Sequence, residues 1–305
     1  MTMKKALLFF ITLLAAQIFF SCSKTYEEKG SPAYIKEINY WHRKRIENLK
    51  KENGWLNLAG LYWLKRGENK FGTDKTNDVI FPEGKAPGLI GVFNLSDSIV
   101  TVKIENGVDV TCNGKNVSEL KLKNDTQDNP TVLQYGSLRW FIIKRGDKYG
   151  VRLRDLDSPL LKSFDDIDTY PINSDWRIEA HLEPYNPAKK ILVPNILGMV
   201  DTALVKNAIV FVKDGVTCKI DPLEEGNKYF IIFADKTSGK ETYGAGRFLY
   251  ADKPDSTGKL FVDFNKAYNP PCSFTKFATC PLPPKQNHLM MEVTAGEKKY
   301  GHGEE

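Results

Sequence analysis

The stretch Ser137–Asp155, SLRWFIIKRGDKYGVRLRD, contains two runs of strand-forming residues separated by a short polar turn. Aromatic and β-branched residues are frequent in both runs, as is typical of strands that pack on a half-buried surface. Gly146 and Asp147 stand between the runs, and such a pair is a common signal for a tight hairpin. The stretch therefore predicts two adjacent antiparallel strands.

Similar short runs recur on both sides of this stretch, from VIFP (79–82) to KLFVDFN (259–265) and HLMMEVTA (288–295). Gly, Asn, Asp and Pro punctuate them, and further hairpin signals occur at Asn106-Gly107, Asn113-Gly114 and Asp214-Gly215. Many short strands with few helical segments are typical of β architectures. We expect a mainly β protein, an antiparallel sandwich or a barrel-like sheet.

One helix is expected, close to the N-terminus. Ser31 is a good N-cap and Pro32 suits the first helical position, whereas Asn53 and Gly54 are a common stop. Between these signals the apolar residues recur at helical spacing: Tyr34, Ile38, Trp41 and Leu49. The pattern favours a helix that lies across a sheet, with the basic run 42–45 in solvent.

The first 22 residues have the features of an export signal. Lys4 and Lys5 precede an apolar run, residues 6–20, that is too short to be a firm membrane span. Ser21 and Cys22 then resemble a lipobox, which predicts a lipid on Cys22, with ordinary signal cleavage or an uncleaved anchor as alternatives. We expect a signal peptide (1–21), a tether (22–31), a single β-rich domain (32–300) and a tail (301–305), on an envelope lipoprotein held at a membrane surface.

Charge and motifs exclude several classes of function. The chain has 43 basic and 38 acidic residues, and no Lys/Arg block is dense enough to predict nucleic-acid binding. The Gly-x-Ser-x-Gly, His-Glu-x-x-His and Cys-x-x-Cys motifs are missing. Neither a cofactor nor a metal is therefore expected, and a small-molecule ligand is the expected partner. The oligomeric state stays open.

A long irregular segment, residues 263–297, is rich in cysteine, proline and asparagine. Long loops on a rigid scaffold often carry function, so we expect this Cys/Pro-rich C-terminal loop to form the wall of a site. Cys272 and Cys280 lie close in sequence, and an oxidising compartment would permit a disulfide between them. By the chain-entropy model this bond would contribute about 2–3 kcal/mol.

Three arginines are candidates for binding charge. Arg152 and Arg154 are two residues apart in a strand run, so they share one face and could clamp a carboxylate or phosphate. They could equally form structural salt bridges. Arg247 follows Gly244 and Gly246, which suggest a bulge or the close approach of a ligand to the backbone.

Three hypotheses about function follow. The first is a hydrolase that uses carboxylate acid–base chemistry together with polar positioning groups. The second is a non-catalytic protein that binds a small acidic or carbohydrate-like ligand, and the third is a structural module whose loop seals a barrel end. The candidate catalytic residues are Arg247, Asp263, Glu297 and Glu241, and the candidate ligand-binding residues are Arg152, Arg154, Asn265, Asn269 and Asn287.

Several of these segments resemble one family. The motifs GWLNLAGLYWLKRGENKFG, VRLRDLDSP, TYGAGRFLY, VDFNKAYNPPC and FATCPLPPKQNHL together are similar to the bacterial and archaeal family called domain of unknown function 1684, over residues 32–300. The resemblance implies no activity, substrate or cofactor. It implies that the following positions belong to the family's pattern: Gly54, Trp55, Arg152, Arg154, Asp155, Gly246, Arg247, Asp263, Asn265, Asn269, Cys280, Pro281, Asn287 and Glu297.

Overall fold

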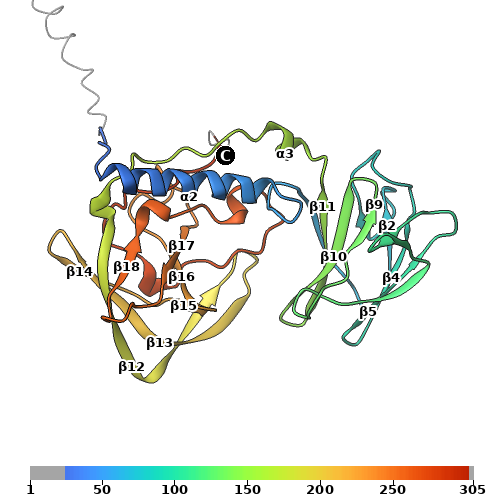
Figure 1. The fold of residues 1–305 in the computed structure, drawn as a ribbon. Coiled ribbons are helices and arrows are strands. Elements are labelled where there is room, and N and C mark those ends of the chain that lie inside the picture. The colour runs from blue at the N-terminus through green and yellow to red at the C-terminus, as the bar shows by residue number, and fades with distance from the viewer. Residues whose placement is uncertain (1–24, 302–305) are drawn as a thin grey trace, which may run out of the picture.

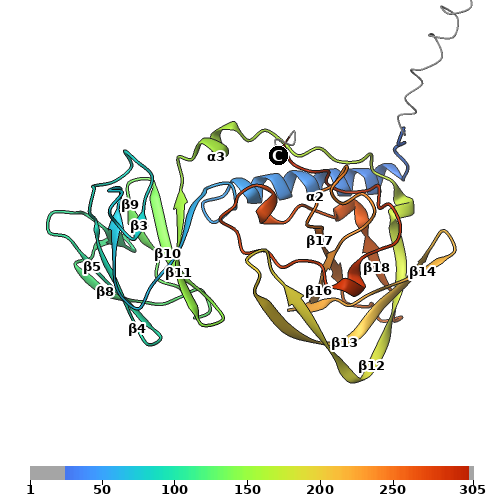
Figure 2. The ribbon, with the colours of Figure 1, turned by 180° about the vertical axis from the view of Figure 1, so that it is seen from behind.

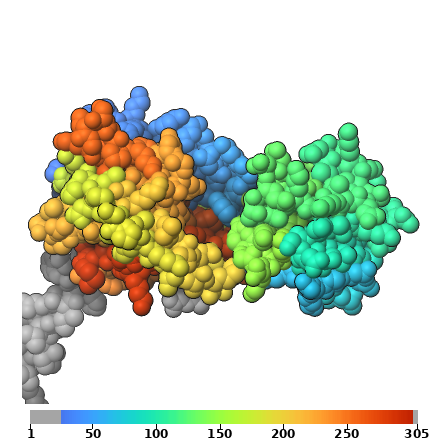
Figure 3. Space-filling model, turned by 90° about the horizontal axis from the view of Figure 1, so that it is seen from below, coloured from blue at the N-terminus to red at the C-terminus, as the bar shows by residue number. Residues whose placement is uncertain are grey.

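The computed structural model describes residues 25–301. Strands account for 44% of the chain and helices for 13%. The sheets are antiparallel apart from one short parallel strand pair, and residues 25–301 form no closed barrel. The expected mainly β fold is confirmed, and it is consistent with a sandwich. Figure 1 shows two β-rich lobes side by side, which we call the N-terminal lobe (57–157) and the C-terminal lobe (162–301). Viewed from below, the two lobes form two separate bulges (Figure 3).

The N-terminal lobe consists of two sheets. The first has the strand order β1-β11-β10-β9-β6-β7: Leu58–Trp63, Lys148–Asp155, Leu138–Arg145, Leu133–Tyr135, Thr111–Cys112 and Lys115–Asn116. The second has the order β3-β2-β4-β5-β8: Val79–Ile80, Gly67–Gly72, Gly91–Ser96, Ile99–Ile104 and Glu119–Leu122.

Alternating side chains from both sheets form a core of their own in this lobe. Trp140 is fully buried and contacts Phe71 and Phe81, while Phe71 stacks on Phe93 with centroids 4.2 Å apart. The predicted hairpin is present, because β10 and β11 pair along their length and Gly146 takes a left-handed φ of 55° in the turn.

The C-terminal lobe also has two sheets. The order β14-β13-β12-β18 comprises Val216–Ile220, Val200–Lys213, Arg177–Pro194 and Leu260–Asp263. The order β15-β16-β17 comprises Leu223–Glu225, Lys228–Phe233 and Arg247–Asp252. A separate hydrophobic cluster fills the space between these sheets. The single domain over 32–300 stays a prediction. Within these residues, each lobe has its own main hydrophobic core.

Helix α2, Pro32–Lys50, lies across the C-terminal lobe and ends near the N-terminal lobe (Figures 1 and 2). The predicted N-cap is confirmed, since the Ser31 hydroxyl accepts a hydrogen bond from the Tyr34 amide at 3.2 Å. Ile38 and Leu49 are buried on its inner face. A short helix, α3 (Pro159–Ser163), begins the connection that runs beside α2 to β12.

From the end of β18 to residue 301, the chain has single 3₁₀ turns and isolated bridges in place of helices and strands; the turns are Phe264–Lys266, Pro271–Ser273 and Lys285–Asn287. The expected strand at 288–295 is wrong, because this segment is irregular apart from an isolated bridge at His288. Its carbonyl groups at Val293 and Ala295 accept hydrogen bonds from the guanidinium of Arg247 instead of from a neighbouring strand. The expected long irregular C-terminal loop is therefore present.

The segment 25–31 packs against the C-terminal lobe. The hydroxyl of Tyr26 donates to the carboxylate of Glu241 at 3.3 Å, and Lys29 forms an ion pair with Asp175 at 2.7 Å. The predicted signal peptide and Cys22 lie outside the described residues. Within residues 25–301, no helix is long and apolar enough to cross a membrane.

Candidate functional site

A groove lies between α2 and the sheet β15-β16-β17. It consists of two adjoining hollows of about 540 and 510 Å³, which share Trp41 and Tyr250 in their walls. Each volume is within the range of small-molecule sites, about 300–1,000 Å³. We call this feature the α2 groove. Its aromatic half is lined by Trp41, Lys44, Arg45, Asn48, Trp55, Phe230, Phe248, Tyr250, Tyr268 and Pro271.

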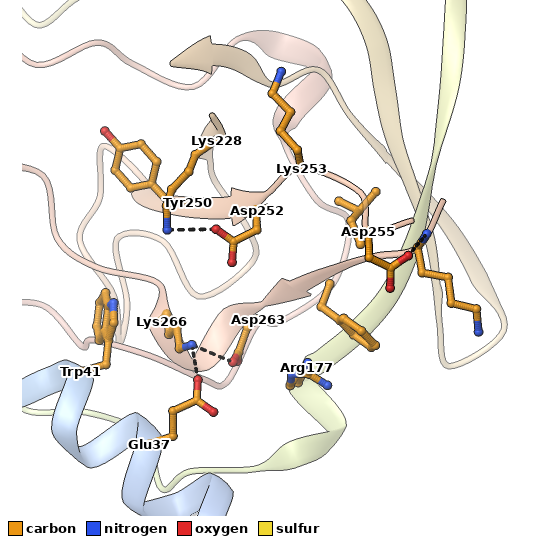
Figure 4. A pocket seen from close by; sticks show the side chains of 14 residues that line it. Glu37, Trp41, Arg177, Lys228, Tyr250, Asp252, Lys253, Asp255, Asp263 and Lys266 are labelled. Atoms are coloured by element: carbon orange, nitrogen blue, oxygen red, sulfur yellow. Dashed lines mark hydrogen bonds and ion pairs between the residues drawn. The ribbon is translucent and has the colours of Figure 1, made fainter. Parts of the chain in front are cut away.

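The other half of the groove is charged, and Figure 4 shows it from close by. Glu37 and Trp41 reach it from α2, while Tyr250 and Asp252 reach it from β17. Its remaining walls come from β12, β16, β17, β18 and the adjoining turns: Arg177, Lys228, Ala251, Lys253, Asp255, Lys259, Leu260, Phe261, Asp263 and Lys266.

The alternation of strand side chains explains the aromatic floor. On β17, Phe248 and Tyr250 point to one face, and Phe230 of β16 lies opposite Tyr250 in the register. The Phe230 and Tyr250 ring centroids are 5.0 Å apart. Tyr268 continues the row, because its ring is nearly parallel to that of Tyr250 at 6.4 Å. Part of this aromatic row is accessible to a ligand, since Tyr250 is 38% exposed.

Helix α2 provides the opposite wall. Trp41 and Arg45 are one turn apart on the same face, as i and i+4 residues are. The Trp41 ring lies 6.3 Å from that of Tyr268, and the Arg45 guanidinium lies over the Tyr268 ring at 4.6 Å. The expectation that the basic run 42–45 is solvated is wrong for His42, which is largely buried, and for Arg45, whose side chain is only 13% exposed.

Arg45 also joins the helix to the C-terminal loop. Its Nε donates to the carboxylate of Glu297 at 3.2 Å, and its Nη2 donates to the carbonyl of Asn269 at 2.8 Å. The other oxygen of Glu297 accepts the amide of Asn269 at 2.6 Å. Burial raises the pKa of Glu297, while Arg45 acts to lower it. Glu297 therefore holds α2 in place, which is a structural role.

Asp263 lies at the charged end of the groove. Its Oδ1 accepts hydrogen bonds from the Tyr34 hydroxyl at 2.9 Å and from the amide and side chain of Asn265, each at 3.2 Å. Burial and the Asp263 charge raise the pKa of Tyr34, so its hydroxyl stays protonated. Oδ2 of Asp263 is buried without a hydrogen-bond partner, and the ammonium of Lys266 is 3.9 Å away.

Arg247 does not line the groove. It starts β17 on the face opposite Phe248, so its side chain points into the lobe together with Leu249. Its guanidinium is wholly buried and pairs with Asp235 at 3.0 Å. It also donates to the carbonyls of Val293, Ala295 and Glu297. These contacts attach the C-terminal loop to the sheet.

The structure separates the predicted catalytic carboxylates from one another. Asp263 lines the α2 groove, whereas Glu297 lines a different cleft of about 420 Å³ beside His42. Glu241 lines a third hollow, together with residues near the C-terminus. These three acids and Arg247 therefore do not meet in one pocket.

The other predicted binding residues also have partners within the protein. Arg152 and Arg154 share a face of β11, as expected, and burial lowers the pKa of each to about 10. Arg152 donates to Thr279 at 3.2 Å and Arg154 to Asn57 at 2.7 Å. The amide of Asn287 bridges Asp221 and Ile232. Asn265 and Asn269 likewise bond to neighbouring backbone groups.

The predicted disulfide is not formed, because Cys272 and Cys280 are both free thiols. Cys272 is in the 3₁₀ turn Pro271–Ser273, where its backbone N–H donates to the sulfur of Cys280 at 3.1 Å. The Cys280 sulfur thus accepts a hydrogen bond from the turn, and no covalent bond joins the two sulfur atoms. This corrects the sequence-based prediction.

The sequence reasoning missed the aromatic residues that form the groove. Trp41, Phe230, Tyr250 and Tyr268 were expected to be core residues or were not singled out, because apolar side chains are usually buried. One signal was available: Phe248, Tyr250 and Asp252 alternate with Arg247, Leu249 and Ala251. This alternation places the aromatics and Arg247 on opposite faces of one strand.

Fold and site together define a β-rich, two-lobed protein with an aromatic groove under its N-terminal helix. Residues 162–298 match the family described as "Protein of unknown function (DUF1684)". The resemblance is thereby confirmed for the C-terminal lobe, and the match does not extend over the N-terminal lobe. No curated protein matches the chain. The solution NMR structure of an uncharacterized protein of Haloarcula marismortui is 28% identical, covering 48% of this chain and 83% of that one, with a TM-score of 0.39.

Proposed function

We propose that the protein binds a small molecule in the α2 groove. The observation that supports this most is the row of partly exposed aromatic rings facing Trp41 across an open hollow of about 510 Å³. Ligand sites typically combine an apolar wall with a few convergent polar groups, and the charged half of the groove supplies the polar groups. A loop that merely sealed a barrel end would not require such a groove.

Hydrolysis has less support. It would require the predicted carboxylates to converge with Arg247 on one reacting centre. Glu297 and Glu241 face other hollows, and Arg247 is occupied by Asp235 and three carbonyl groups. The binding function is therefore the one that the geometry favours.

Removing one wall of the groove should weaken binding of a neutral apolar dye. We expect N-phenyl-1-naphthylamine to bind the protein, and Trp41→Ala or Tyr250→Ala to raise its Kd at least about tenfold through lost aromatic contact. Fluorescence titration measures this change. Tyr40→Ala is the matched control, because Tyr40 is also on α2 but is 55% exposed and does not line the groove.

A second apolar surface provides a further control. Leu192 and Leu204 are 62% and 70% exposed on the β12–β13 hairpin. The double variant Leu192→Ser/Leu204→Ser should leave dye binding unchanged. Loss of binding in this variant, with normal binding in Trp41→Ala, would place the apolar site on the hairpin and contradict the proposal.

We further propose that this binding takes place in the cell envelope, on a protein held to a membrane by lipid at Cys22. The support is in the sequence: two lysines, a short apolar run and a lipobox-like Ser-Cys pair. Protein extracted from membranes should then begin at Cys22 with an acylated N-terminal peptide. Mass spectrometry of that peptide tests this, and an unmodified Cys22 would contradict it.

A further inference from the structure

We infer that the ligand of the α2 groove is a neutral saccharide. This inference rests on the proposed binding function and adds the chemical class of the ligand. A saccharide has apolar C–H faces on its rings and hydroxyl groups around their edges. The groove has the two complementary surfaces side by side, an aromatic half and a charged half that share Trp41 and Tyr250.

The aromatic half is lined by closely packed rings that are nearly parallel to one another. Tyr250 and Tyr268 are within 13° of parallel, and Phe230 lies beside Tyr250 at 31°. The exposed aromatic surface, above all that of Tyr250, which is 38% exposed, suits a sugar ring, because a C–H face can pack on it and leave water. Trp41 and Trp55 close the opposite side and the end of this half.

The charged half is poorly suited to an anion. Glu37, Asp252, Asp255 and Asp263 line it, and they would repel a carboxylate or phosphate. Its lysines already have acidic partners at 2.6–3.0 Å: Lys228 with Asp252, Lys253 with Glu224, Lys259 with Glu179 and Lys266 with Glu37. The guanidinium of Arg177 lies over the Phe261 ring at 3.8 Å.

Hydroxyl groups fit this mixture of donors and acceptors, because each hydroxyl can both donate and accept. The closely spaced ammonium and carboxylate groups around Lys266 offer both kinds of partner (Figure 4). Oδ2 of Asp263 adds an acceptor without a hydrogen-bond partner, on a residue that is 7% exposed. A hydroxyl that enters between Lys266 and Asp263 would supply the missing donor.

Isothermal titration with defined oligosaccharides tests the inference. The probes are cellotetraose, chitotetraose and maltotetraose, which are neutral, and trigalacturonic acid, which is anionic. We expect at least one neutral probe to bind, at least about tenfold more tightly than the acid. Trp41→Ala and Tyr250→Ala should each weaken that binding at least about tenfold. Tyr40→Ala should change it less than about twofold, and thermal unfolding checks that all variants fold.

The outcomes separate this inference from the function on which it rests. If the dye binds the groove but no neutral saccharide binds, or if the acid binds most tightly, the inference of a neutral saccharide ligand is contradicted. The proposal that the groove binds a small molecule is then unaffected. If saccharide binding is unaffected by both groove variants, the assignment of the sugar to this groove is wrong. If neither dye nor saccharide depends on Trp41 and Tyr250, both proposals fail.

Discussion

Arg247→Met is expected to lower the free energy of unfolding by about 3–5 kcal/mol. The substitution leaves the carboxylate of Asp235 buried without its cation, and both side chains of this pair are 0% exposed. It also removes the donor from the carbonyls of Val293 and Ala295, which lie at 2.9 and 2.5 Å from the guanidinium. Buried acceptors that lose their donors carry the full desolvation cost. Urea unfolding monitored by circular dichroism measures the change.

Two further variants establish the cause. Arg43→Ala is the control, because Arg43 is an exposed arginine on α2, which packs on the same lobe, and its loss should cost less than about 0.5 kcal/mol. In Arg247→Met/Asp235→Asn the unpaired charge is gone, so part of the stability should return. An Arg247→Met protein within about 1 kcal/mol of wild type would show that the buried pair does not hold the loop.

Acidification is expected to destabilise the fold through His42. Its imidazole, on α2, is largely buried beside the Trp41 ring and the Asn265 backbone, and burial lowers its pKa from 6.5 to about 4. The unfolded chain therefore binds more protons than the folded one between pH 6.5 and pH 4, and stability is lost as the pH falls through this window. At pH 5 the loss is about 2 kcal/mol relative to pH 8.

His42→Gln should remove most of this pH dependence, because glutamine does not titrate and can still donate a hydrogen bond to the Asn265 carbonyl. Unfolding free energies at pH 8, 6 and 5 measure the slope. Asp166 and Arg45 are the charged groups with the largest influence on His42, and they act in opposite directions. His181→Gln is the control, since His181 is 64% exposed. Equal slopes in wild type and His42→Gln would contradict the assignment.

Much of the fold could be predicted from the sequence. Strand runs with alternating side chains, together with turns such as Gly146-Asp147, specify antiparallel pairs through local geometry alone. The helix start at Ser31 is equally local. The irregular structure of segment 288–295 could not be predicted from its strand-like composition. Its carbonyl groups at Val293 and Ala295 accept hydrogen bonds from Arg247, so they do not pair with a neighbouring strand. Whether a strand-like run finds a partner strand is decided by tertiary contacts.

Of the predicted catalytic and ligand-binding residues, only Asp263 lines the α2 groove. The polar residues of the C-terminal loop attracted attention because irregular loops often carry function. In the structure these residues largely bond to backbone groups of the segments packed against the loop: Asn265 donates to the carbonyl of Asn173, Asn269 to that of Lys298 and Asn287 to that of Ile232. Buried groups of an irregular backbone need hydrogen-bond partners, and polar side chains often supply them. A single sequence does not distinguish side chains with this structural role from side chains that bind a ligand.

The docking of Tyr26 limits how far the protein could extend from a membrane. Tyr26 is tied to Glu241 and Lys29 to Asp175, so the chain is already part of the C-terminal lobe at these residues. Tyr26 is the fourth residue after Cys22, and a fully extended chain spans about 14 Å at most over these four steps. A lipid on Cys22 would then be a short membrane anchor, and the C-terminal lobe would lie close to the bilayer with a restricted orientation.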